Sequence, residues 1–110
     1  MDVAFASKRL QQQCSTERDR KKAFGTSTTQ LNRRLVQLDA ADCLEDMRYL
    51  PGHCHELSAD RDGQLAVDIS PNRRLIFCPN HRPSPLREDG GLDWSKVTKV
   101  LVLEVEDYHG

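Results

Sequence analysis

The fold class is decided by the stretch Leu65-Ala66-Val67-Asp68-Ile69-Ser70-Pro71-Asn72-Arg73-Arg74-Leu75-Ile76-Phe77-Cys78. Its first half places Leu65, Val67 and Ile69 in alternation with small or polar residues, which is the pattern of a half-buried strand. Pro71-Asn72 is a turn signal, and the apolar run after it predicts a second strand over residues 74–78. The stretch therefore predicts two antiparallel strands joined by a chain reversal.

Two more strands extend this pair along the chain. Residues 53–57 predict a strand that precedes Asp62-Gly63, a pair typical of tight hairpins because glycine adopts positive φ without a steric penalty. We therefore expect an antiparallel meander of three consecutive strands. A final strand is predicted over residues 97–107, and its centre, residues 100–103, is apolar on both faces, which favours an interior position covered on both sides.

The N-terminal part of the chain begins with a short predicted strand and then turns helical. The strand covers residues 3–6, and Ser7 is expected to cap a helix over residues 8–13. Ser15 or Thr16 offers a second capped start, because acidic residues follow closely in the sequence. The first elements are therefore a strand followed by two helical segments.

The second helical segment runs to Asp39 and has one weak point, at Gly25. We expect the helix to break there. Beyond the break, Leu31, Leu35 and Leu38 lie on one side of the helix and predict a stripe that packs on the sheet. The other sides carry polar residues, namely Asn32, Arg33, Arg34 and Gln37.

A short helical turn over residues 43–49 is expected next, with Asp42 as its cap and Pro51-Gly52 as its end. Residues 79–95 form an unusually long loop, and Trp94 is expected to pin that loop onto the domain. The complete order is βααββββ. It predicts one α+β domain over residues 1–110, with a mainly antiparallel sheet and the N-terminal helices on one face.

Composition places the chain among small soluble domains. Its 110 residues are 37% hydrophobic, enough for one core, and its longest apolar runs are far below the ~20 residues of a membrane span. With no signal-like N-terminal segment, we expect a cytoplasmic protein, no membrane partner and four reduced cysteines. A net charge of -1 removes the simplest argument for nucleic-acid binding, so any cationic site must be local.

Three motifs follow one another along the chain: Leu50-Pro51-Gly52 with His55-Glu56-Leu57, then Asp60-Arg61-Asp62-Gly63 with Arg74-Leu75-Ile76-Phe77, and last Glu106-Asp107-Tyr108-His109. Their order and spacing resemble the HigB-like branch of the RelE/ParE toxin superfamily, the plasmid maintenance killer proteins. The resemblance implies a RelE-like fold and a ribosome-dependent mRNA endoribonuclease. It also implies a helix-turn-helix, HigA-like antitoxin as partner, with operator DNA contacted only through that antitoxin.

The resemblance implies metal-free cleavage through the 2′-OH of the RNA, without a cofactor. That reaction needs a base, an acid and cations beside the phosphorane. Histidines suit proton transfer, arginines hold phosphate, and a tyrosine can stack on a base. The catalytic residues that the resemblance implies are His55, Arg74, Asp107, Tyr108 and His109, and RNA contacts are expected from Arg61, Arg73 and Arg74.

One position departs from the family pattern. Ser58 stands where a lysine that contacts the scissile phosphate is usual, and loss of such a contact commonly costs about 10²-fold in rate. The nuclease is therefore expected to be weak unless an arginine substitutes. The alternative is a catalytically weak or inactive toxin-fold protein that acts as a partner and co-regulator of its antitoxin.

A third hypothesis is a small zinc-binding domain. Cys54-His55 and Cys78 with His81 supply four candidate ligands, which adjacent antiparallel strands bring into proximity. Neighbouring residues on a strand point to opposite faces, however, so Cys54 and His55 are poorly placed to bind one ion. We therefore predict no metal site.

Overall fold

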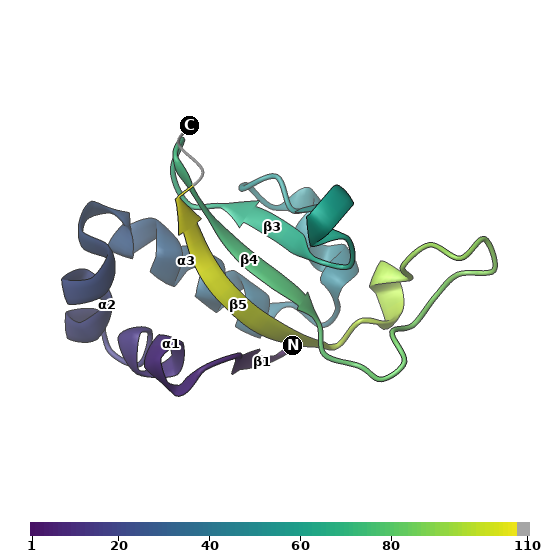
Figure 1. The fold of residues 1–110 in the computed structure, drawn as a ribbon, viewed down its shortest axis with the longest axis horizontal. Coiled ribbons are helices and arrows are strands. Elements are labelled where there is room, and N and C mark those ends of the chain that lie inside the picture. The colour runs from purple at the N-terminus through teal and green to yellow at the C-terminus, as the bar shows by residue number, and fades with distance from the viewer. Residues whose placement is uncertain (108–110) are drawn as a thin grey trace.

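The computed structural model describes residues 1–107, which form a five-stranded sheet with three α-helices (Figure 1). The strand order is β1-β5-β4-β3-β2. Strand β1 pairs with β5 in parallel, and every other pair is antiparallel. The strands are β1 (Asp2–Phe5), β2 (His55–Glu56), β3 (Leu65–Asp68), β4 (Arg73–Pro79) and β5 (Lys99–Asp107).

The helical segment begins and breaks where its caps and its glycine predict. Ser7 caps α1 (Lys8–Gln13) by accepting a hydrogen bond from the Leu10 amide, and Thr16 caps α2 (Glu17–Phe24) through the Asp19 amide. Gly25, at φ 56° and ψ -122°, ends α2 in a backbone conformation that disfavours other residues. A 3₁₀ turn, η1 (Gly25–Ser27), then leads into α3 (Thr28–Ala40).

The core lies between α3 and one face of the sheet. Leu31 and Leu38 of α3 are fully buried there, as the predicted stripe requires, against Leu75 and Phe77 of β4. Helix α2 contributes no buried residue and packs against α1 and α3. The two short helices, α1 and α2, therefore lie beside the sheet (Figure 1). The α+β class and the meander of β2, β3 and β4 are confirmed; the break at Gly25 gives three α-helices, where the predicted order βααββββ counts two.

Arg34 is the main exception to the expected polar side of α3. It is only 6% exposed, and its guanidinium donates hydrogen bonds to the Asp68 carbonyl and the Gln37 side chain. Burial is the largest effect that lowers the pKa of this guanidinium. Arg34 was placed among the polar sides of the helix, but its position there does not show that Asp68, at the end of β3, offers a carbonyl to a buried cation.

Several turns differ from the expected ones. The strand predicted over residues 53–57 is only two residues long, and the link to β3 contains a 3₁₀ turn, η3 (Ala59–Arg61). Asp62 and Gly63 then form a turn in which Asp62 is extended and Gly63 has positive φ. The Gln64 amide closes this turn by donating to the Arg61 carbonyl. The tight two-residue hairpin that was expected here does not form.

In the segment before β2, the predicted N-cap residue was also wrong. A 3₁₀ helix, η2 (Leu44–Tyr49), forms where a short helical turn was predicted. Its N-cap residue is Cys43, and Asp46 accepts a hydrogen bond from the Asp42 amide, so Asp42 is not the cap.

The long loop after β4 is pinned by Trp94, as predicted. Trp94 begins η4 (Trp94–Lys96) and is buried, with its indole N–H donating to Glu56 at 3.0 Å and the Arg48 guanidinium 4.1 Å from its ring centre. Strand β5 has the expected interior position between β1 and β4. Only one of its faces is fully buried at the centre, however, because Leu101 and Leu103 remain partly exposed.

Candidate functional site

The two faces of the sheet carry different residues. Leu65, Val67, Leu75 and Phe77 point toward α3 and belong to the core. Strand alternation places their neighbours on the opposite face, which we call the open face because none of α1, α2 and α3 covers it (Figure 1). Its residues on β3 and β4 are Ala66, Asp68, Arg74, Ile76 and Cys78, of which Ala66 and Ile76 are fully buried.

His55 lies on the open face, because it is paired with Ala66 across the β2–β3 ladder. Its ring stacks on that of His53, with centroids 4.4 Å apart. The His55 Nδ1 atom lies 2.7 Å from the His53 carbonyl oxygen. A carbonyl only accepts hydrogen bonds, so Nδ1 carries the proton in this contact, and Nε2 of the neutral ring is then the acceptor nitrogen.

A β-bulge decides which acids of β5 reach the open face. On β4, Ile76 and Phe77 are consecutive, but their partners on β5 are Glu104 and Val102, so Leu103 is an extra residue. Before the bulge the even positions of β5 face the core, and after it they face outward. Glu104 and Glu106 therefore lie on the open face beside Ile76 and Arg74.

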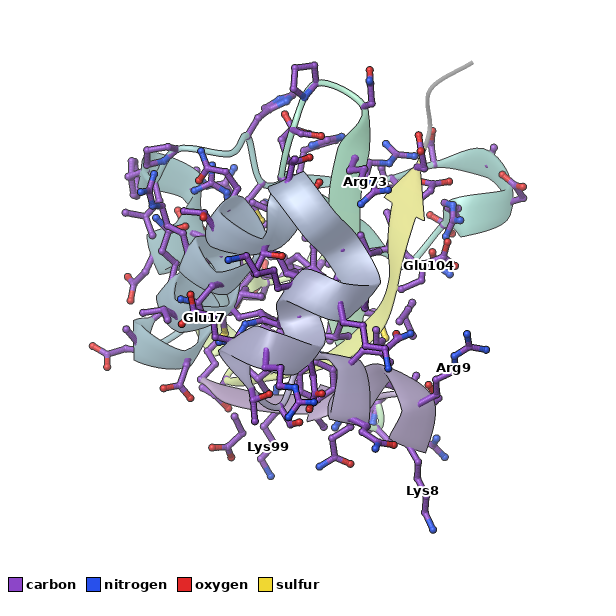
Figure 2. All side chains as sticks on the ribbon, turned by 90° about the vertical axis from the view of Figure 1, so that its left-hand side faces the viewer. Lys8, Arg9, Glu17, Arg73, Lys99 and Glu104 are labelled. Atoms are coloured by element: carbon purple, nitrogen blue, oxygen red, sulfur yellow. The ribbon has the colours of Figure 1, made fainter. Side chains whose placement is uncertain are left out.

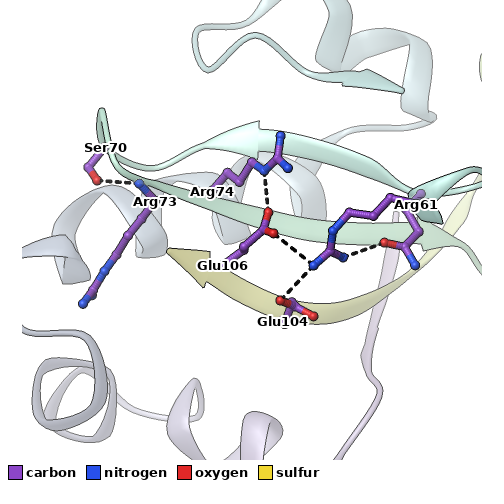
Figure 3. A network of polar contacts seen from close by, with 7 residues as sticks. Arg61, Ser70, Arg73, Arg74, Glu104 and Glu106 are labelled. Carbon is purple, nitrogen blue, oxygen red and sulfur yellow. Dashed lines mark hydrogen bonds and ion pairs between the residues drawn. The ribbon is translucent and has the colours of Figure 1, made fainter. Parts of the chain in front are cut away.

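These two glutamates hold two arginines in one network (Figure 3). The Arg74 Nε atom donates to Glu106 at 2.6 Å. Arg61, placed by η3, donates from Nη2 to Glu106 at 3.1 Å and to Glu104 at 3.2 Å. The Arg61 Nη1 atom also donates to Gln64 at 2.8 Å. The open face thus brings together Arg61 and Arg74 from distant segments, with Glu106 between them.

The network is electrostatically balanced. The hydrogen bond and the charge of Arg74, and after them the charge of Arg61, lower the pKa of Glu106 below its ordinary value, so this carboxylate stays ionised at neutral pH. Arg74 and Glu106 are only 20% and 21% exposed, whereas Glu104 is 48% exposed. Two cations and two anions meet here, so the arginines of the open face do not form a patch of unopposed positive charge.

Arg73 and Asp107 lie on the other side of the sheet. The Arg73 guanidinium reaches toward the helices, where it donates to the Phe24 carbonyl at 3.1 Å and lies 3.4 Å from Ser27 Oγ. Asp107 is its partner across the β4–β5 ladder, with a carboxylate oxygen 4.0 Å from Arg73 Nε. Figure 3 shows the Arg73 and Arg74 side chains diverging. The structure thus places Arg73 and Asp107 apart from the face that holds His55, Arg61 and Arg74.

The remaining predicted positions lie near this face or outside the described residues. Ser58 is exposed and precedes η3, and its carbonyl accepts a hydrogen bond from the Arg61 amide at 3.1 Å. Tyr108 and His109 lie outside residues 1–107. Other basic residues project from the helical end, such as Lys8 and Arg9 on α1 (Figure 2).

The sequence analysis missed Glu104 and Glu106. A signal for them exists in the spacing of Val100, Val102 and Val105, which lengthens from two residues to three. Such a slip in the apolar alternation indicates a bulge and exchanges the faces of all later residues. Without the bulge, Asp107 would share the face of Arg74, and the two glutamates would point toward the helices.

The zinc hypothesis finds no support among residues 1–107, where no group of three or more histidine, cysteine or acidic side chains could hold a metal ion. Burial raises the pKa of the Cys54 thiol to about 12, which disfavours the thiolate that zinc requires. His81 instead accepts hydrogen bonds from the Thr98 and Lys99 amides. Also within the described part, no helix is long and apolar enough to cross a membrane.

Comparison with known proteins identifies the fold. No family model matches the chain, and no curated protein does. Among solved structures, a YoeB/ParE toxin from Agrobacterium tumefaciens matches with a TM-score of 0.60, over 99% of this chain and 100% of that one. The chain shares the fold of that toxin. Because the two sequences are 8% identical, the likeness concerns the fold and does not separate the HigB-like branch from others.

Proposed function

We propose that this protein is the toxin of a type II toxin–antitoxin system and cleaves mRNA on the ribosome. Two lines support the proposal. The fold is similar, over the whole chain, to that of a YoeB/ParE toxin. The motifs around His55, Arg61 and Arg74 resemble those of HigB-like toxins, and His55 lies on the same open face on which Arg61 and Arg74 both contact Glu106.

The observation that carries the proposal is the convergence of Arg61 and Arg74 on the open face beside Glu106. They come from η3 and β4, so only the folded chain brings their guanidinium groups together. Paired guanidinium groups match the oxygens of a phosphodiester and stabilise the extra negative charge of a phosphorane. Arg61 is also the cation nearest in sequence to Ser58, where the family has a lysine.

His55 is our candidate for proton transfer from the attacking 2′-OH. Its Nδ1 is engaged by the His53 carbonyl, which orients Nε2 as the acceptor. His109 is proposed to complete the site as leaving-group acid and Tyr108 as base-stacking residue, whereas Asp107 lies on the other side of the sheet and is given no role beside His55. The products would be a 2′,3′-cyclic phosphate and a 5′-OH. The proposed partner that silences this activity is a helix-turn-helix antitoxin, through which alone operator DNA is contacted.

A second function is favoured by a specific observation. Glu104 and Glu106 already occupy the two arginines, and Ser58 supplies no cation. A protein with this face could be a weak or inactive nuclease that acts mainly as a partner of its antitoxin. In that case the antitoxin complex would form tightly while mRNA remained intact.

Induced expression followed by mapping of mRNA 5′ ends tests the two functions. We expect cleavage sites for the wild type, and a loss of at least about 10²-fold for Arg74→Ala and His55→Ala. Arg33→Ala removes an exposed arginine of α3 and is the matched control, expected to cleave as the wild type does. Intact mRNA in wild-type cells at high expression, together with tight antitoxin binding, would favour the second function.

A further inference from the structure

The glutamates of the open face occupy the guanidinium positions that an RNA phosphate would use. Glu106 alone contacts both Arg74 and Arg61, and Glu104 adds a second carboxylate to Arg61. A carboxylate and a phosphate present similar oxygen pairs to a guanidinium fork. The same donor hydrogens cannot serve both anions at full strength, so the two anions compete.

We propose that Glu104 and Glu106 are internal competitors for the substrate phosphate, and that they set how tightly the protein binds RNA. This inference rests on the proposed function in one respect only, that the competing ligand is an RNA phosphodiester. In the free protein the carboxylates satisfy Arg61 and Arg74. RNA binds when its phosphate displaces them, so its affinity is reduced by the free energy of the arginine–glutamate contacts.

The β-bulge in β5 supports a role for the placement of Glu104 and Glu106 beside the two arginines. The β-bulge at Leu103 interrupts the β4–β5 ladder and turns both glutamates to the open face, where they oppose the cations. Regular pairing would have left Arg61 and Arg74 without these carboxylates. The bulge therefore builds the competing anions into the same strand pair that carries Arg74.

The contacts also predict a difference between the two glutamates. Glu106 touches both arginines, through contacts of 2.6 and 3.1 Å, and is mostly buried. Glu104 touches Arg61 alone at 3.2 Å and is 48% exposed, so solvent screens that contact more. Removing the charge of Glu106 should therefore strengthen RNA binding more than removing that of Glu104.

The test is the dissociation constant of a fluorescent single-stranded 2′-O-methyl RNA, which cannot be cleaved through its 2′-OH. We expect Glu106→Gln to bind about fivefold or more tightly than the wild type, and Glu104→Gln to show a smaller gain. Glu45→Gln is the matched control. Glu45 also pairs with an arginine, Arg48, and its loss changes the net charge equally, but the pair lies on η2.

A variant cycle shows whether the gain passes through the two arginines that Glu106 contacts. In an Arg61→Ala, Arg74→Ala background, Glu106→Gln should give no gain beyond that of Glu45→Gln. Fluorescence of Trp94, the only tryptophan, verifies that each variant is folded. If Glu106→Gln does not fold, Glu104→Gln, at a more exposed position, tests the same competition through Arg61.

The inference is overturned if Glu106→Gln binds no better than Glu45→Gln, or if its gain survives when both Arg61 and Arg74 are alanine, whatever the cleavage assay shows. The proposed function can fail separately. Tighter RNA binding by Glu106→Gln that depends on these arginines, with intact mRNA in cells, would support the competition while removing the nuclease.

Discussion

At the residue scale, the charge of the open face depends on the partner that each charged side chain contacts. Arg73 and Arg74 are adjacent in sequence, yet one reaches the Phe24 carbonyl beside the helices and the other Glu106 on the opposite face. Alternation along a strand is enough to separate them. An arginine pair in a sequence is therefore not evidence for a doubled cationic site, and we assign RNA contacts to Arg61 and Arg74 ahead of Arg73.

Ser58→Lys should strengthen the proposed nuclease. Ser58 is exposed and lies three residues before Arg61, so a lysine there would add a cation near the open face that the two glutamates do not already satisfy. We expect more mRNA cleavage and slower growth at equal expression. Asn32→Lys adds the same charge at an exposed position of α3 and controls for net charge. Unchanged growth for Ser58→Lys would contradict a phosphate contact at that position.

The ion pairs of Glu106 predict a pH dependence of stability. Arg74 and Arg61 lower the pKa of this carboxylate in the folded protein, so its ionised form stabilises the fold. That contribution is fully present above the unfolded-state pKa of about 4.3 and is lost as the pH falls through the lowered folded value. In urea unfolding, the wild type should exceed Glu106→Gln in stability at neutral pH, and the difference should shrink below about pH 4. A difference independent of pH would contradict this origin.

At the element scale, Arg34 joins α3 to the end of β3, and Gly52 lies against the same contact. Arg34 donates to the Asp68 carbonyl at 2.8 Å, and the Gly52 carbonyl accepts from the Asp68 amide at 2.7 Å. Gly52 has φ +109°, and a Cβ there would lie 2.7 Å from both Arg34 Nε and Val67 Cγ2. Glycine is thus needed for backbone conformation and for the close approach of a buried cation.

Gly52→Ala should therefore destabilise the protein by about 2–4 kcal/mol, because strained backbone and overpacking add together. Gly90→Ala is the matched control, since Gly90 has φ +89° but no atom within 4 Å of the added Cβ. We expect a loss of only about 1 kcal/mol there. The free energy of unfolding in urea measures both. Equal losses of unfolding free energy for the two variants would show that Arg34 moves away from the added Cβ without destabilising the protein.

At the scale of the whole molecule, one core unites segments from the full length of the described chain. Leu10, Leu31, Met47, Phe77 and Val100 all belong to it, and Trp94 joins it from the long loop. The parallel pairing of β1 with β5 further couples the N-terminal strand to the last one. No segment holds a separate core of its own among the contacts described, so the chain is expected to unfold as a unit.

This architecture predicts a single cooperative transition. Trp94 fluorescence, which reports the loop and core, should coincide in urea with far-UV circular dichroism, which reports helices and strands. Trp94→Phe would keep most of the packing but remove the hydrogen bond to Glu56, so its midpoint should fall while the transition stays single when followed by circular dichroism. Non-coincident wild-type curves would indicate that the helical part unfolds separately.

Local chemistry determined much of this protein from its sequence. Ser7, Thr16 and Gly25 set helix boundaries through contacts within a few residues, and the alternation over residues 65–70 and 74–78 predicted strands. The α+β class and the antiparallel meander follow from such short-range signals, and the structure confirms both. Strand alternation also places His55 and Arg74 on the same face, whereas Arg61 reaches that face from η3.

Strand pairing decided which acids face those cations, although the spacing of Val100, Val102 and Val105 carries a signal for it. The bulge at Leu103 arises where β5 must pair with β4, and it exchanges Asp107 for Glu104 and Glu106 on the open face. Arg34 is buried for a similar reason, because its partner carbonyl belongs to a segment far along the chain. A side chain's face depends on the register of its partner strand, and register is a property of two segments together.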